Sequence, residues 1–269
     1  MAPDLEAALR ARLRRLDSAL VALSGGVDSS VVAALAAQEL GQRALAVTGV
    51  SASLPQDDLQ EIEALCATLG LAHTTVTTRE LMSPGYVANS PERCYFCRDE
   101  LYGALKRLAA ERGFAAVIDG TTADDMRGHR PGRRAAGEHD IISPLLEAGA
   151  GKAEVRALAR KLGLDNALRP ASPCLGSRIA YGVPVTVERL ERVGRAESYL
   201  RSLGFSDLRV RLHDAIARIE VPVHELGRAA EHAPAIVVEL KRLGFVYVTL
   251  DLAGLRSGSL LEVVRGDAP

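Results

Sequence analysis

The chain has 269 residues, of which 48% are hydrophobic and 25% charged, and its formal net charge is −1. This length suits one large domain or two modest ones, and the composition is ordinary for a soluble globular protein. With 33 basic against 34 acidic residues, the sequence has no basic excess of the kind that holds nucleic acid. No segment approaches the about 20 apolar residues of a membrane span, so we expect a cytoplasmic protein.

In the first half of the chain, short β-like segments alternate with helical ones. We expect strands at 18–23, 43–50, 73–78 and 115–119, and helices at 27–40, 55–69, 91–112 and 152–163. Gly41 and Gly70 follow two of these helices as C-caps. The alternation predicts an α/β fold, a doubly wound parallel sheet with helices on both faces.

The pattern changes after a stretch at 169–181 that is rich in Pro, Ser and Gly. There we expect a helix at 187–203, strands at 208–212 and 217–221, mainly helical structure at 222–243 and a closing strand at 245–250. This order is typical of a smaller α+β domain. We therefore predict a nucleotide-binding domain at 1–175 and a C-terminal α+β domain for substrate binding and oligomerisation at 185–269.

The string SGGVDS at 24–29 joins the first strand to the first helix of the sheet. Backbone N–H groups and the helix dipole favour an anion there, and Gly25 and Gly26 allow close approach to phosphate oxygens. Ser24 and Ser29 add hydroxyl donors, and Asp28 adds a carboxylate that can hold the loop or a metal. The string lacks the lysine of the P-loop but resembles the SGGxDS signature of the PP-loop ATP pyrophosphatases, whose loop holds the leaving pyrophosphate.

A second polar string, DGTTADD at 119–125, follows another expected strand. In a doubly wound sheet the carboxyl ends of the strands meet at the ligand crevice. The pair Asp124 and Asp125 can bind Mg²⁺ that carries ATP phosphates, because Mg²⁺ prefers oxygen ligands. Asp125 is favoured, since many members of the superfamily that the chain resembles place an acidic residue here.

Three of the four cysteines suggest a metal centre. Cys94 and Cys97 lie three positions apart near an expected helix start, and Cys174 lies in the irregular loop. Alone, a C-x-x-C pair is compatible with redox chemistry, metal binding or coincidence. Three cysteines suit an iron–sulfur cluster with one iron free of protein ligands, or a zinc site. Cys66 lies in an apolar helical stretch and is expected in the core.

These motifs together resemble the LarE-type pyridinium-3,5-biscarboxylic acid mononucleotide sulfur transferases, over nearly the whole chain. The resemblance is carried by SPERCYFC at 90–97, DGT at 119–121, RPG at 130–132, ASPCLGSR at 171–178 and the C-terminal strings at 200–205, 209–211, 217–220 and 247–252. It implies an ATP-dependent enzyme that adenylates a carboxylate of that nucleotide. The carboxylate then becomes a thiocarboxylate, in biosynthesis of the nickel-pincer nucleotide cofactor of lactate racemase.

The family has two chemistries. Some members give up the sulfur of one of their own cysteines, and others hold a 4Fe-4S cluster on three cysteines and transfer a sulfide bound to it. The triplet Cys94, Cys97 and Cys174 resembles the cluster type. The resemblance thus implies ATP, Mg²⁺ and a 4Fe-4S cluster as cofactors, a sulfide or persulfide donor as a partner, repeated turnover and a homo-oligomer.

The nucleotide substrate carries a phosphate and therefore needs cations. Arg178, Arg209 and Arg211 are candidates, because guanidinium groups bind phosphate in bidentate fashion. Arg209 and Arg211 alternate on an expected strand and so share one face, although such a face can also simply be solvated. Glu197 and Glu220 match acidic positions that the family places near the phosphate or metal site.

Three other functions compete with this interpretation. A tRNA 2-thiolation enzyme combines the same loop with three cysteines but needs an RNA-binding surface, which the balanced charge and the aromatic content of 4% do not favour. An ammonia-using adenylating synthetase needs no cysteine triplet. A nucleotide-binding regulatory protein would release no AMP or pyrophosphate.

Overall fold

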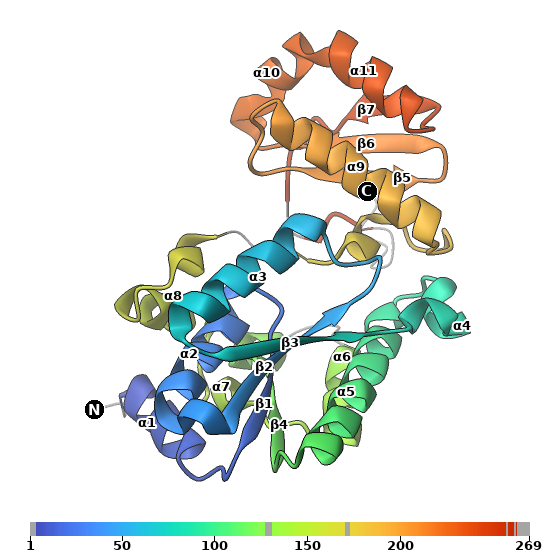
Figure 1. Ribbon diagram of the computed structural model, residues 1–269. Coiled ribbons are helices and arrows are strands. Elements are labelled where there is room, and N and C mark those ends of the chain that lie inside the picture. The colour runs from blue at the N-terminus through green and yellow to red at the C-terminus, as the bar shows by residue number, and fades with distance from the viewer. Residues whose placement is uncertain (1–3, 127–130, 170–172, 257, 261, 263–269) are drawn as a thin grey trace. The chain divides into compact units, whose positions relative to one another are not determined.

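The computed structural model describes residues 4–126, 131–169, 173–256, 258–260 and 262 (Figure 1). Arg130 of the RPG string and residues 171–172 of the ASPCLGSR string lie outside this range. The chain forms two compact units, Met1–Glu80 with Cys94–Ser172, and Leu81–Arg93 with Pro173–Pro269. Residues 81–93 therefore pack with the C-terminal part of the chain, although they belong to the first half of the sequence.

The larger unit is built on the parallel sheet that the alternating segments predict. Its strand order is β3-β2-β1-β4, and every pairing is parallel. The strands are β1 (Ala19–Ala22), β2 (Ala44–Val50), β3 (Ala72–Thr77) and β4 (Ala116–Ile118). Val21 of β1 lies between Ala46 of β2 and Ile118 of β4 in the register. The predicted α/β fold class is confirmed.

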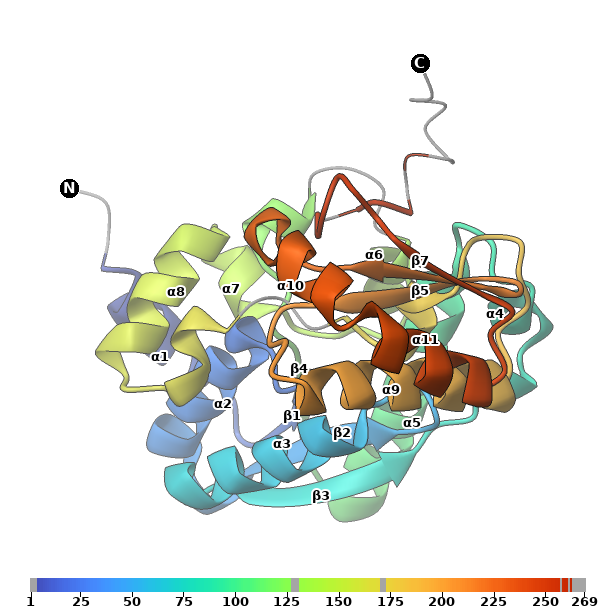
Figure 2. The same ribbon diagram turned by 90° about the horizontal axis from the view of Figure 1, so that it is seen from above.

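Helices cover both faces of this sheet because successive strand residues point to opposite sides. Ala19 and Val21 join one buried cluster, while Leu20 joins the other. The first cluster packs against α1 (Leu5–Leu13), α2 (Val27–Leu40), α3 (Gln56–Leu69), α7 (Pro144–Glu147) and α8 (Lys152–Lys161), and the second against α5 (Arg93–Arg112) and α6 (Gly132–Glu138). Both α1 and α8 lie against α2 (Figure 2).

Two local features behave as expected. The helix α3 ends at Gly70, which caps it in the left-handed conformation with φ of 60°. Cys66 is 2% exposed in the first apolar cluster, and burial raises the pKa of its thiol to about 11. Cys66 is therefore a core residue, as predicted.

The smaller unit has a mixed sheet of order β5-β6-β7, in which β5 and β6 are antiparallel and β6 and β7 parallel. The strands are β5 (Arg209–His213), β6 (Ile216–Glu220) and β7 (Tyr247–Leu250), and the helices are α4 (Pro84–Val87), α9 (Val187–Ser202), α10 (Leu226–Glu231) and α11 (Ala233–Arg242). Asp214, with φ of 54°, occupies the tight turn between β5 and β6. This is the small α+β arrangement that the sequence predicts.

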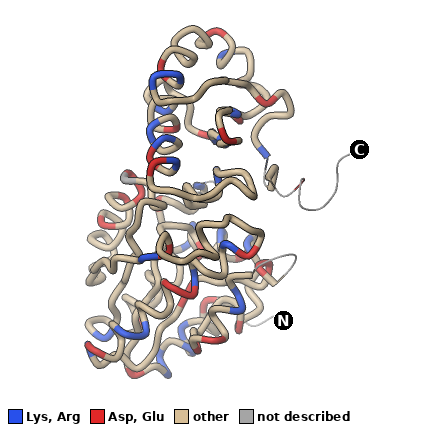
Figure 3. The backbone as a smooth tube through the Cα atoms, turned by 90° about the vertical axis from the view of Figure 1, so that its right-hand side faces the viewer, with Lys and Arg blue, Asp and Glu red and all other residues tan. Residues whose placement is uncertain are grey.

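Charges of both signs are interspersed along the traced chain (Figure 3), in keeping with the balanced composition. In the part of the chain that the structure describes, every helix is too short or too polar to traverse a lipid bilayer.

Candidate active site

The SGGVDS string forms the turn from β1 to α2, at the carboxyl edge of the parallel sheet. Gly25 has φ of 74°, which a residue with a side chain rarely adopts, and Gly26 is the N-cap of α2. The Ser29 hydroxyl donates to the Gly26 carbonyl at 3.0 Å and accepts from the Ser24 N–H at 3.3 Å. The loop is therefore held by its own backbone and hydroxyl groups at a helix N-terminus, which suits an anion.

Two glycines are required here by close packing. A Cβ at Gly25 would lie 2.9 Å from the side chain of Ile62 on α3. A Cβ at Gly120, just after β4, would lie 2.5 Å from the backbone nitrogen of Ser29. The turn after β4 thus packs directly on the first turn of α2, which brings the two polar strings together at one edge of the sheet.

Asp119, the first residue of the second string, is a buried anchor. Its carboxylate accepts hydrogen bonds from the hydroxyls of Tyr102 at 2.7 Å, Thr121 at 2.6 Å and Ser143 at 2.7 Å. Arg98 of α5 lies 3.4 Å away and completes the set. Burial raises the pKa of the Tyr102 hydroxyl, the charge of Arg98 opposes this shift, and the charge of Asp119 adds to it. With its oxygens engaged in this way, Asp119 holds the turn after β4.

The next two carboxylates of that string face α8. Asp124 accepts from the backbone N–H of Lys152 at 2.6 Å, and Asp125 lies 3.4 Å from the ammonium group of the same lysine. Asp125 also accepts from the N–H and hydroxyl of Thr122 at 3.1 and 3.0 Å. Lys152 therefore brings a positive charge to the start of α8, beside the predicted magnesium ligand.

Asp28 supplies the carboxylate of the SGGVDS loop. Its Oδ1 atom is buried and has no hydrogen-bond partner among the described residues. Burial raises the pKa of Asp28, Lys152 opposes this shift, and Asp125 adds to it. Asp28, Asp125 and Lys152 therefore lie within electrostatic reach of one another, and a cation among them would offset the burial of Asp28.

The C-x-x-C pair lies on the first turn of α5, which begins at Arg93. Cys94 is exposed and Cys97 half-buried. Residues three apart in a helix share a face, so both thiols are presented from one side of this turn.

Cys174 precedes the short 3-10 helix η5 (Leu175–Arg178) of the smaller unit. Arg178 is fully buried and donates to both carboxylate oxygens of Glu197, at 2.8 and 3.1 Å. It also donates to the carbonyls of Pro173 and, at 3.3 Å, of Cys174. Arg178 therefore fixes the backbone on which Cys174 lies, and Glu197 balances its charge.

The same segment is held from residues 81–93. Arg93 donates to the Gly176 carbonyl at 2.7 Å and to the Asn89 side chain at 2.5 Å. A Cβ at Gly176 would lie 2.9 Å from the Tyr86 hydroxyl and 3.6 Å from the Cys174 sulfur. A larger residue there would therefore displace the Tyr86 hydroxyl. The residue that precedes Cys94 in the chain is thus hydrogen-bonded to the segment that carries Cys174.

Two further arginines lie on β5, with side chains on one face of the strand. Arg211 donates to Glu220 at 3.0 Å and to the Ser177 carbonyl at 3.0 Å. Burial, followed by the charge of Arg178, lowers the pKa of Arg209 to about 10. Arg178 and Arg211 thus lower the pKa of Arg209 further, while the carboxylates of Glu197 and Glu220 oppose this shift.

The predicted site residues divide between the two units. The larger contains Ser24, Gly25, Gly26, Asp28, Ser29, Cys94, Cys97 and Asp125, and the smaller contains Cys174, Arg178, Glu197, Arg209, Arg211 and Glu220. Among the described residues, no group of three His, Cys, Asp or Glu side chains is arranged to hold a metal ion. The phosphate loop at 24–29 thus lies in the larger unit, and the three arginines Arg178, Arg209 and Arg211 lie in the smaller one.

Sequence reasoning assigned no role to Lys152, Arg93 or Asn166. Arg93 belongs to the SPERCYFC string at 90–97, and Lys152 is the first residue of the helix predicted at 152–163. The position of each residue in the sequence could therefore have indicated a role. Asn166 had none, because its partners lie 136 and 141 residues away.

The sheet with a glycine-rich loop opening α2 defines a class, the PP-loop ATP pyrophosphatases. A family model described as asparagine synthase matches residues 2–172. A Synechocystis sp. protein described as uncharacterized is 46% identical over 95% of this chain and 96% of its own. The pyridinium-3,5-bisthiocarboxylic acid mononucleotide synthase of Lactiplantibacillus plantarum is 39% identical over 96% of this chain and 94% of its own. A GMP synthase of Thermus thermophilus is 33% identical over 80% of this chain but 46% of its own.

The chain belongs to the LarE-type family within this class. It is accordingly an ATP-using enzyme that forms AMP and pyrophosphate.

Proposed function

We propose that this enzyme is an ATP-dependent sulfur transferase acting on pyridinium-3,5-biscarboxylic acid mononucleotide in nickel-pincer nucleotide biosynthesis. It would convert a carboxylate of this substrate to a thiocarboxylate. The observation that carries the proposal is the 39% identity, over nearly the full length of both chains, to a synthase of the bisthiocarboxylic product.

The first step is activation of the substrate carboxylate, which is a poor electrophile because its leaving group would be oxide. Attack of this carboxylate on the α-phosphorus of ATP forms an acyl-adenylate and expels pyrophosphate. Ser24, Ser29 and the N–H groups of the loop would hold the pyrophosphate, and Lys152 would neutralise part of its charge. Such a step depends mainly on positioning and on fixed dipoles.

A magnesium ion suits the oxygen donors beside the loop. The unpartnered Oδ1 of Asp28 and the carboxylate of Asp125 are the ligand types that Mg²⁺ prefers. Asp125 would hold the ion, with Asp28 as a second donor, and the ion would neutralise phosphate charge.

We propose Cys94, Cys97 and Cys174 as ligands of a 4Fe-4S cluster. Support comes from the placement of two thiols on one helical turn and from the bond between Arg93, next to Cys94, and Gly176, near Cys174. Such a cluster would supply the sulfide that ends in the thiocarboxylate, with AMP as the leaving group of the acyl-adenylate. A sulfide donor, or a persulfide donor together with two electrons from a reductant, would restore it. Arg178 and Arg93 hold the Cys174 backbone in this scheme.

Arg209 is the preferred contact for the substrate phosphate. Arg211 is a second candidate on the same face of β5, although its donors are already directed to Glu220 and to the Ser177 carbonyl. An anion would offset the burial and the neighbouring arginine charges that lower the pKa of Arg209. Arg178 is less suited, because its donors are directed to Glu197 and to backbone carbonyls. Glu197 and Glu220 would act by holding these arginines in place. Residues 185–269 would then bind substrate, and their role in forming a homo-oligomer stays a prediction.

The decisive experiment is anaerobic turnover with the nucleotide substrate, Mg-ATP and sulfide. We expect AMP and pyrophosphate together with a product in which sulfur replaces a carboxylate oxygen, as read by mass spectrometry. AMP formation that requires ammonia instead of sulfide, or tight salt-sensitive binding of tRNA, would overturn the proposal.

The cluster has its own test, in iron and sulfide analysis and the electronic spectrum after anaerobic reconstitution. Serine variants of Cys94, Cys97 and Cys174 should each lose iron, whereas Cys66→Ala should retain it because Cys66 is a core residue. Iron binding that is unchanged in all three serine variants would exclude this ligand set.

A further inference from the structure

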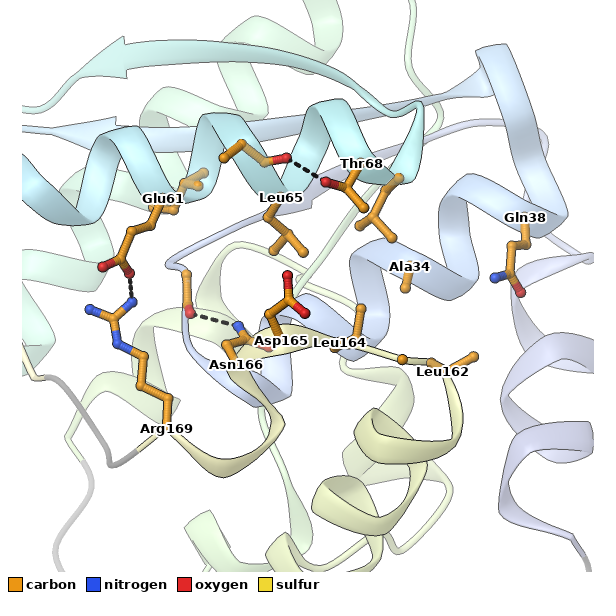
Figure 4. Close-up of a pocket in the computed structure, with 15 residues that line it drawn as sticks. Ala34, Gln38, Glu61, Leu65, Thr68, Leu162, Leu164, Asp165, Asn166 and Arg169 are labelled. Carbon is orange, nitrogen blue, oxygen red and sulfur yellow. Dashed lines mark hydrogen bonds and ion pairs between the residues drawn. The ribbon is translucent and has the colours of Figure 1, made fainter.

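A short segment of the larger unit is hydrogen-bonded to Gly25 of the phosphate loop. This segment is the 3-10 helix η4 (Asp165–Leu168). The side-chain nitrogen of Asn166 donates to the Gly25 carbonyl at 3.0 Å (Figure 4). The same nitrogen donates to the Ser30 hydroxyl at 2.8 Å. Because a carbonyl can only accept, the atom of Asn166 that faces Gly25 must be its nitrogen.

The first of these bonds fixes a peptide group of the loop, and the second reaches a side chain that contacts the next peptide group. The Ser30 hydroxyl, which accepts from Asn166, itself donates to the Gly26 carbonyl at 2.9 Å. Asn166 thus holds the Gly25 carbonyl directly and supports one of the donors to the Gly26 carbonyl, which also accepts from the Ser29 hydroxyl and the Ser30 N–H. In a planar trans peptide the C=O and the following N–H point in opposite directions. The N–H group of Gly26 is therefore directed away from Asn166, and that of Val27 away from Ser30.

The segment that carries Asn166 is itself braced on both sides. Arg156 of α8 donates to the carbonyls of Ala167 and Arg169, both at 3.0 Å. Arg169 pairs with Glu61 of α3 (Figure 4). It also pairs with Asp58 of the same helix at 2.9 Å. Asn166 is therefore a fixed point for the loop.

Asn166 also lines a cavity of about 650 Å³ between α2, α3 and η4. The Oδ1 atom of Asn166 is buried and has no hydrogen-bond partner among the described residues. Only the donor side of the amide is used. An aspartate of the same shape would lose both donated bonds and would place a carboxylate against the Gly25 carbonyl.

We propose that Asn166 is a positioning residue for ATP phosphates: its amide aims the loop N–H groups at the pyrophosphate. The inference rests on the proposed function, in which the loop binds the leaving group. Asn166 acts through Gly25 and Gly26, and its effect should therefore appear in phosphate affinity more than in fold stability.

The test compares Asn166→Asp with the matched control Gln38→Glu. Both change an amide to an acid in the same cavity, but Gln38 only accepts a bond, from Arg10, which an acid can also accept. Binding of Mg-pyrophosphate and Mg-ATP is measured by calorimetry, with thermal unfolding alongside. We expect affinity for both ligands to fall by about tenfold or more in Asn166→Asp and to stay within twofold of wild type in Gln38→Glu.

A conservative variant separates positioning from a purely structural role. Asn166→Gln keeps the donor, and the adjacent cavity leaves room for its extra methylene, so it should recover part of the affinity and lower the KM for ATP relative to Asn166→Asp. Pyrophosphate affinity equal to wild type in folded Asn166→Asp would overturn the inference. If Asn166→Asp does not fold, Asn166→Ala decides by the same binding measurement. A wild-type protein that binds neither ligand would instead refute the proposed ATP chemistry.

Discussion

The phosphate loop and the Cys174 segment achieve rigidity in different ways. The loop is held by neutral hydroxyl and amide groups and by glycines that leave no room for a Cβ, as at Gly25 and Gly120. The Cys174 segment is held by buried charge, in the pairs Arg178–Glu197 and Arg211–Glu220. A neutral site can open its N–H groups to an incoming anion, whereas a buried ion pair mainly fixes its own geometry. We therefore expect the two regions to respond differently to substitution.

The largest expected effect is on the buried ion pair. Glu197→Gln leaves the Arg178 charge buried and uncompensated, which should lower the free energy of unfolding by about 3–5 kcal/mol. Glu188→Gln, on the same helix α9, is the control, since Glu188 is 80% exposed in its pair with Arg192 and such pairs contribute about 0–1 kcal/mol. Urea unfolding measures both. Equal losses in the two variants would show that the Arg178–Glu197 pair does not fix the segment.

The next effect concerns space at the loop. Gly120→Ala places a Cβ against the Ser29 backbone, and overpacking of this kind costs about 1–3 kcal/mol. Because the displaced atoms belong to the loop, pyrophosphate affinity should fall as well. Gly137→Ala is the matched control: it lies on α6 with open space at its Cβ position, so stability should rise by about 0.5–1 kcal/mol. Unchanged pyrophosphate affinity in Gly120→Ala would show that the packing of the string at 119–125 on the loop at 24–29 does not affect phosphate binding.

A smaller effect follows from Asp28. Because burial raises its pKa, the folded protein binds this proton more tightly than the unfolded chain does. Stability is therefore lost as pH rises from the ordinary carboxyl pKa through the raised one. Asp28→Asn should remove this loss, stabilising the protein at neutral pH by about 1 kcal/mol, with no difference at pH values below the ordinary carboxyl pKa.

Urea unfolding at neutral and acidic pH checks the Asp28 prediction. A variant that is destabilised at neutral pH but not at acidic pH would show that the charged carboxylate stabilises the loop, and would contradict this prediction. Pyrophosphate binding with Mg²⁺ should weaken in the same variant, because an amide is a poorer magnesium ligand than a carboxylate.

The phosphate loop and the Cys174 segment also differ in how far they could be predicted from the sequence. The loop at 24–29 was predictable because its chemistry lies in consecutive residues between a strand and a helix, and α2 was predicted at its observed bounds. The parallel sheet followed from local periodicity. The partners of Arg178 and Asn166 were not predictable, since Glu197 lies 19 residues away and Gly25 lies 141. Arg178 was expected at the substrate phosphate, yet its donors are directed to protein groups that only the fold brings near.

The smallest expected effect is on the outer brace of η4. Arg169→Ala removes the pairs with Asp58 and Glu61, but Arg169 is 32% exposed and Glu61 55%, so solvent screens much of their attraction. We expect a loss of about 0.5 kcal/mol in stability and a change in pyrophosphate affinity well below that of Asn166→Asp. Unfolding and calorimetry under the same conditions provide both values. Because Arg156 still holds the carbonyl of Ala167, η4 should stay in place. An affinity loss as large as that of Asn166→Asp would mean that the phosphate loop also depends on charge pairs. The contrast between the loop and the Cys174 segment would then be weaker than their contacts indicate.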